Sequence, residues 1–187
     1  MRILETQVFQ FDELSKEAKQ NVIDKWYETE DYPFLTENLQ EQLDYLDCYF
    51  SETELQYSLS YCQGDGLSFS GNFDFKKWLN DKTDLKKSVQ WALCEHVAYI
   101  KSKGNNGHYA FCSKSDIDYE YEYTEMKEIE KLFEDDILPD IQDYYIQLCN
   151  QLEKSGYSEL EYRMDFNEFS EHCEANLYEF TKDGELV

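Results

Sequence analysis

Hydrophobic residues recur with a helical period in two stretches of the first quarter of the chain. Ala18, Val22 and Trp26 are spaced four residues apart, and Ser15 precedes them as an N-cap residue. Over residues 35–46, leucines line one face of a second predicted helix. The other positions of this second helix are acidic, at Glu37, Glu41, Asp44 and Asp47.

Two stretches of alternation follow, and this pattern is typical of half-buried strands. Apolar and polar residues alternate over 55–62 and again over 67–73. The segment between them reads Gln63-Gly64-Asp65-Gly66 and predicts a four-residue hairpin loop whose glycines adopt positive φ. It lacks the lysine and following helix of a phosphate-binding loop, and it lacks the spaced oxygen ligands of a calcium loop. Gly64, Asp65 and Gly66 are therefore predicted to form a structural turn.

A second hairpin is predicted after a helical region over 75–95, in which Thr83 is a capping residue. Its first strand covers 97–103, and its second strand is long and begins at His108 after a glycine-bounded turn. In the far half of the second strand, over 117–123, apolar and aromatic residues alternate with acidic ones. One face of this strand is expected to point inward and the other outward.

The last third of the chain is predicted to be mostly helical. Thr124 is placed to cap a long amphipathic helix that Pro139 kinks or breaks and that Gly156 ends. Asp165 is placed to cap a short helix that runs through Cys173.

These elements predict an α+β fold, with an antiparallel sheet of four to five strands built from hairpins and with helices packed on one side. Short strands are predicted over 4–10 and 178–184. The chain has two prolines, seven glycines and no serine–glycine linker, so we expect one domain over residues 1–187. No apolar run approaches the roughly 18 residues that cross a membrane, and the first residues lack a signal-peptide core. We therefore expect a soluble, cytoplasmic protein without a membrane partner.

Charge is the most informative property of the sequence. Forty-one acidic residues against 17 basic ones give a net charge of −24. Residues 26–75 contain 11 acids and no lysine or arginine, and residues 115–153 contain 13 acids and two bases. Such an excess repels nucleic acid and attracts basic surfaces. The candidate partner-binding residues come from the acidic blocks 28–54 and 116–143: Glu37, Glu41, Asp44, Glu120, Glu122, Glu128, Asp135 and Asp136.

A lysine stripe separates the two acidic blocks. Residues 76–114 contain three acids and eight lysines, namely Lys76, Lys77, Lys82, Lys86, Lys87, Lys101, Lys103 and Lys114. Trp78, Trp91 and Tyr99 accompany them, and a small basic face is one interpretation. The chain has only two arginines, however, and arginine forks dominate contacts to phosphates and bases. We expect the stripe to pair with the protein's own acidic faces or with a second copy in a homodimer, and we expect no direct binding to nucleic acid.

Cysteine and histidine positions indicate neither a disulfide framework nor a metal site. The six cysteines are scattered without a CxxC pair and are expected to be free thiols. His172 and Cys173 are adjacent, which places them on different faces of a helix. His96 and His108 flank the second predicted hairpin without a nucleophile beside them in the sequence. No catalytic residue, metal or cofactor is predicted.

Three segments, over 11–19, 58–71 and 178–184, resemble in their order and spacing a family of largely uncharacterised acidic proteins encoded by phages and prophages. The hairpin with Gln63-Gly64-Asp65-Gly66 and the phenylalanine and glycine downstream of it is the most specific mark. Leu67 stands where the family tends to have a small residue. The resemblance implies an origin in a mobile element and a location in the host cytoplasm, and it implies no particular activity.

Charge and resemblance together suggest a phage-encoded inhibitor of a host nucleic-acid-targeting defence system, of the anti-CRISPR or anti-restriction type. Its partner would be a host protein with a basic surface, such as a nuclease. The alternative is an enzyme or nucleic-acid-processing factor that uses the hairpin around Gln63–Gly66. A third interpretation is an acidic phage protein whose charge serves solubility alone.

Overall fold

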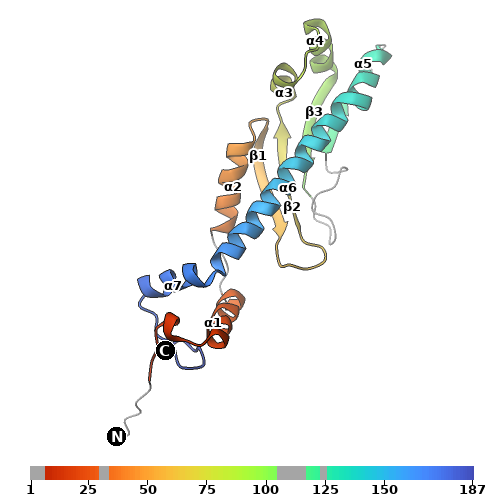
Figure 1. Cartoon of the computed structure of the whole chain (residues 1–187). Coiled ribbons are helices and arrows are strands. Elements are labelled where there is room, and N and C mark those ends of the chain that lie inside the picture. Colours follow the sequence, from red (N-terminus) through yellow and green to blue (C-terminus); the bar gives the residue numbers. More distant parts are fainter. Residues whose placement is uncertain (1–6, 30–33, 105–116, 123–125) are drawn as a thin grey trace. The chain divides into compact units, whose positions relative to one another are not determined.

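A four-stranded antiparallel sheet forms the centre of residues 36–156 (Figure 1). Its strands are β1 (Phe50–Ser58), β2 (Gly66–Phe73), β3 (Val97–Lys103) and β4 (Ile117–Tyr121), and strands that follow one another in sequence are neighbours in the sheet. The pairs β1–β2, β2–β3 and β3–β4 are all antiparallel. The predicted α+β class is therefore confirmed.

This computed structural model describes residues 7–29, 34–104, 117–122 and 126–187. The chain forms two units: the first contains residues 1–35 and 157–187, and the second contains residues 36–156. A compact unit is not by itself an independently folding domain, so the single domain remains a prediction.

Aromatic side chains attach the inner face of the sheet to α6 (Leu138–Arg163) and to η3 (Phe133–Ile137). Phe69 of β2 and Tyr145 of α6 are both fully buried, and the Tyr145 hydroxyl donates to the Phe69 carbonyl at 2.9 Å and accepts from the Phe69 amide at 3.2 Å. Tyr119 and Tyr121 of β4 pack on the Phe133 ring at 5.4 and 5.5 Å. The alternation predicted for β4 is confirmed, since Glu120 lies exposed between these two inward tyrosines.

The long C-terminal helix follows a different path from the predicted one. It begins as α5 (Lys127–Leu132), continues through the π-helical stretch η3 and becomes α6. Pro139 lies in the first turn of α6, just after the π-helical stretch, and the helix continues past it without a break. Gly156 does not end the helix, which continues to Arg163; a side chain at 156 would collide with Leu59. The predicted cap Thr124 lies outside the described residues.

The helical region predicted over 75–95 consists of two helices, α3 (Phe75–Lys82) and α4 (Lys87–His96). Thr83 does not cap the second helix, whose N-cap residue is Lys86. The Thr83 hydroxyl instead donates to the Leu79 carbonyl at 2.7 Å, which satisfies a backbone acceptor at the end of α3.

Helix α2 (Leu35–Leu46) confirms the predicted amphipathic element, with Leu39 and Leu43 almost fully buried. Asp47 departs from the prediction of an acidic outer position, because it is 8% exposed. Its carboxylate accepts from the backbone amides of Tyr49 at 3.1 Å and Phe50 at 2.7 Å, and from the Tyr144 hydroxyl at 2.6 Å. Asp47 thus connects α2, the start of β1 and α6.

The first unit has its own core, built around Phe11 of η1 (Phe11–Glu13). Phe11, Phe169 and Phe180 pack edge to face, with side chains of α1 (Lys16–Thr29) and α7 (Phe166–Ala175) around them. The predicted caps Ser15 and Asp165 are confirmed, since their side chains accept from backbone amides of α1 and α7.

The short strands predicted at the two ends of the chain are reduced to isolated bridges in the described residues. Phe180 pairs with Phe9 and with Leu186. The predicted residues 4–6 lie outside the described part of the chain, and the tight turn after Phe180 places Gly184 at φ +83°.

Candidate functional site

The outer face of α2 carries three of the candidate acids. Glu37, Glu41 and Asp44 are exposed and follow the i, i+4, i+7 spacing of one helical face. Tyr45 lies beside them and is 87% exposed. Asp44 accepts from the Gln40 amide at 3.1 Å, and among the described residues none of the three carboxylates forms an ion pair. We call Glu37, Glu41, Asp44 and Tyr45 the α2 face.

The other five candidate acids lie on β4 and just after it, on α5 and on η3, with Glu120 on the side of β4 that faces away from Phe133. All five are exposed: Glu120, Glu122, Glu128, Asp135 and Asp136. Asp135 lies 4.0 Å from the Lys131 ammonium, and both side chains are largely in solvent, so that ion pair neutralises little. We call these five residues the β4–α5 face.

The two faces belong to elements that pack at different positions along the continuous helix formed by α5, η3 and α6. Asp47, just after α2, contacts Tyr144, and Leu39 lies next to Gly156, so α2 covers the stretch of α6 from 144 to 156. Strand β4 instead contacts Phe133 of η3, eleven residues before Tyr144 and therefore roughly 16 Å away along a helix axis.

The Gln63–Gly66 segment belongs to a longer loop than predicted, because the last strand pair is Ser58 with Gly66. Gly64 adopts φ +117° and Gly66 φ +156°, as the turn prediction required. Leu59 is buried at the start of the loop. Leu67, which stands where the family that the sequence resembles tends to have a small residue, is fully buried just after the loop.

Asp65 organises this loop from within. Its carboxylate accepts from the Ser60 amide at 2.7 Å, the Cys62 amide at 3.0 Å, the Ser58 hydroxyl at 3.0 Å and the Cys62 thiol at 3.1 Å. The hydrogen bond to this carboxylate raises the pKa of the Cys62 thiol. Such a fully engaged carboxylate is suited to holding a loop, and it leaves the turn without a free acid or base at Asp65.

Glu153 of α6 is a further titratable group, and the charge of Asp65 in this loop acts on it. Burial, followed by the negative charge of Asp65, raises its pKa above the ordinary glutamate value. Both causes favour the protonated carboxyl, so an ionised Glu153 lowers the stability of the fold.

Six of the eight lysines of the stripe lie in three environments, and Lys86 is the N-cap residue of α4. Lys101 and Lys103 lie 4.0 and 3.2 Å from Asp118 on the outer face of the sheet, which confirms for these two the expected pairing with the protein's own acids. Lys77 and Lys82 lie over the Tyr49 ring at 5.7 and 5.9 Å. Lys114 is outside the described residues.

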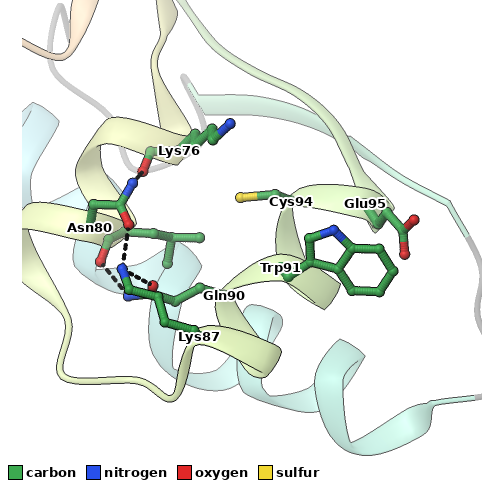
Figure 2. A pocket seen from close by; sticks show the side chains of 8 residues that line it. Lys76, Asn80, Lys87, Gln90, Trp91, Cys94 and Glu95 are labelled. Carbon is green, nitrogen blue, oxygen red and sulfur yellow. Dashed lines mark hydrogen bonds between the residues drawn. The ribbon is translucent and has the colours of Figure 1, made fainter.

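The remaining environment is a cleft of about 380 Å³ between α3 and α4, shown in Figure 2. Lys76, Leu79 and Asn80 line it from α3; Lys87, Gln90, Trp91, Cys94 and Glu95 line it from α4. The Lys87 ammonium donates to the side-chain oxygens of Asn80 and Gln90, each at 2.9 Å. Burial raises the pKa of the Cys94 thiol, and the Lys76 charge opposes that shift. The lysines and Trp91 were visible in the sequence, but Asn80, Gln90 and Cys94 were not, because only the packing of two helices brings them together.

The histidines do not assemble into a catalytic or metal-binding group in the described part of the chain. His96 packs on Tyr121, and His172 packs on Trp26 and Tyr178; His108 lies outside that part. No group of three or more metal-ligating side chains is found among the residues described. The described cysteines are free thiols, at Cys48, Cys62, Cys94, Cys149 and Cys173. Within the same ranges, no helix has the length and apolar character to span a membrane.

No family model, curated protein or solved structure matches this chain. What the fold and the charges define is an acidic α+β protein with two exposed carboxylate faces and one lysine-lined cleft.

Proposed function

We propose that this protein is a phage-encoded acidic inhibitor of a host nucleic-acid-targeting defence system, of the anti-CRISPR or anti-restriction type. It acts in the host cytoplasm by binding a basic surface that otherwise holds nucleic acid. The phage origin comes from the resemblance of the three sequence segments, and the mode of action comes from the charged surface.

The α2 face is the observation that carries the proposal. Its three carboxylates lie within about 10 Å along the helix axis. Successive carboxylates are thus roughly 5 Å apart along the axis, against about 3.4 Å between the charges of one DNA strand, so the face presents a row of like charges at a lower density than DNA. Because no ion pair to a described residue neutralises them, these carboxylates are available to lysines and arginines of a partner. The exposed Tyr45 adds an aromatic contact of the kind that dominates binding energy at interfaces.

The β4–α5 face supplies a second group of carboxylates. A basic nucleic-acid channel is an extended surface, so it can contact acidic faces that lie on different elements. The α2 face is expected to dominate affinity because it combines charge with an aromatic side chain, and the β4–α5 face is expected to contribute mainly to the association rate.

The test is affinity capture from host lysate followed by competition. The wild-type protein should capture a nucleic-acid-binding protein, and duplex DNA or RNA should displace it. The triple variant E37Q/E41Q/D44N should weaken this binding by about a hundredfold, and it should flatten the dependence on salt.

A matched control removes three exposed acids of the first unit, in the variant E17Q/E171Q/E174Q. It makes the same change in net charge and should leave the affinity within about threefold of wild type. Equal losses in the two variants would show that net charge alone attracts the partner. A captured partner that nucleic acid does not displace would contradict the inhibitor mechanism.

A further inference from the structure

The cleft between α3 and α4 combines the features of a small-ligand site in a protein that is otherwise strongly acidic. Its volume of about 380 Å³ falls within the range of small-molecule sites. Trp91 is 63% exposed beside it, while Leu79 is almost fully buried beneath it. An exposed tryptophan at the edge of a cleft that an apolar side chain also lines offers a surface on which a flat ring can stack.

The two lysines of the cleft have no carboxylate partner in the described ranges, unlike Lys101 and Lys103, which share one. Lys87 is held by two neutral amide oxygens. The amides of Asn80 and Gln90 therefore fix the Lys87 ammonium in place without cancelling its charge. Gln90 is itself 6% exposed and anchored to the Leu79 carbonyl at 3.1 Å, so this support is rigid. A positioned cation of this kind is suited to an anionic group.

Figure 2 shows how the remaining groups are arranged. The Cys94 sulfur points from α4 toward α3, with Lys76 and Asn80 on the α3 side and Trp91 and Glu95 on the α4 side. Glu95 follows Trp91 by one helical turn, so its carboxylate lies on the same side of α4 as the indole. A carboxylate next to a stacking surface accepts hydrogen bonds from the amino groups of a nucleobase.

We propose that this cleft binds a nucleoside monophosphate whose base carries an amino group. The base stacks on Trp91 with its amino edge toward Glu95, the phosphate lies beside the Lys87 ammonium, and Lys76 adds positive charge from the α3 side. The surrounding acids select against longer nucleic acids: the two lysines act within the screening length of about 8 Å, and each further phosphate enters the field of a chain with net charge −24. The inference is independent of the inhibitor proposal, because it uses neither the α2 face nor the β4–α5 face.

The test follows the indole N–H resonance of Trp91 in the isotope-labelled full chain, assigned by its loss in W91F. Guanosine 5′-monophosphate should shift this resonance saturably, with a dissociation constant below about 1 mM. Guanosine, inorganic phosphate and uridine 5′-monophosphate should each bind at least about tenfold more weakly, because each lacks the phosphate, the base or its amino group.

Two pairs of lysine substitutions separate a site from general attraction. The variant K76Q/K87Q should lose at least about tenfold in affinity for guanosine 5′-monophosphate and should retain its weak affinity for guanosine. The control K77Q/K82Q makes the same charge change at the lysines over Tyr49 and should bind like wild type. The variant W91A lacks the observed resonance, so its binding is followed by isothermal titration calorimetry: it should show no saturable binding of guanosine 5′-monophosphate, while its circular dichroism matches that of wild type.

Several results would overturn the proposal. One is the absence of a saturable shift with guanosine or adenosine monophosphate up to about 10 mM. Another is an equal loss in the two lysine variants. Tighter binding of a single-stranded oligonucleotide than of the mononucleotide would instead assign the cleft to nucleic acid. Loss of the lysate partner in W91A, without nucleotide binding by wild type, would assign it to protein docking. The triple variant of the α2 face should bind the mononucleotide normally, so failure of either proposal is seen separately.

Discussion

Replacing Asp65 by alanine tests whether the most specific motif of the sequence has a structural role. The substitution removes the acceptor for two backbone amides, one hydroxyl and one thiol. A hydrogen bond to a charged group contributes about 1.5–3 kcal/mol when it is buried. The loop is exposed and water replaces part of the loss, so we expect D65A to lower the free energy of unfolding by about 2 kcal/mol in total. The four donors to this carboxylate are not visible in the sequence, so only the structure gives this magnitude.

Urea unfolding at neutral pH, followed by circular dichroism, measures this loss. With an m value of about 2 kcal/mol/M, the midpoint should fall by about 1 M without a change in m. The control D84A removes an equally negative but exposed side chain between α3 and α4, and its midpoint should stay close to wild type. D65N keeps one acceptor oxygen and should lie between the two. A D65A midpoint equal to that of D84A would refute the structural role. Loss of partner capture by D65A in its folded state would favour the alternative function at this hairpin.

Three further predictions follow from single contacts. Glu153→Gln should stabilise the protein at pH 7, because the folded state binds the Glu153 proton more tightly than the unfolded state and the wild type therefore loses stability as the pH rises through the raised pKa. The gain in stability should vanish as the pH falls below that pKa, and urea midpoints from pH 4 to pH 8 measure it. Cys62 should react with a thiol reagent more slowly than Cys48, which is also exposed, because Asp65 raises the pKa of the Cys62 thiol, and D65N should accelerate the reaction of Cys62. Mass spectrometry of time points measures both rates, and equal rates in wild type and D65N would contradict the effect of Asp65 on this thiol. Gly184→Ala should destabilise the chain by about 1–3 kcal/mol, because φ is +83° and the new methyl would lie 2.7 Å from the Ala18 carbonyl oxygen; a thermal melt like that of wild type would show that the turn relaxes freely.

The elements that the sequence predicted well are those whose signals are local. The leucine spacing of α2 and the alternation of β4 record which face is buried, since burial is what created the pattern. The caps Ser15 and Asp165 act on amides two or three residues away, so their roles are also readable locally.

The features that the sequence did not predict depend on contacts between distant segments. Gly156 reads as a helix end, yet it lies inside α6 because Leu59, almost a hundred positions earlier, packs on it. Asp47 reads as one more surface acid, yet the Tyr144 hydroxyl and two amides bury it. Burial and this hydrogen bond to Asp47 raise the pKa of Tyr144 strongly, so Tyr144 keeps its hydroxyl proton and donates it to Asp47.

Whether a carboxylate has such contacts within the fold also determines how the net charge of −24 should be interpreted. Composition counts every carboxylate equally, but Asp47, Asp65 and Asp118 are engaged with internal donors and lysines. A partner senses mainly the carboxylates without such contacts, and the α2 face contributes these at a density that composition does not reveal. Mutual repulsion among uncompensated carboxylates also destabilises the folded chain, so neutralisation by a basic partner removes a cost that the free protein carries. An acidic protein with this arrangement should therefore gain thermal stability on binding its partner, and the gain should be greatest at low ionic strength, where the repulsion is least screened.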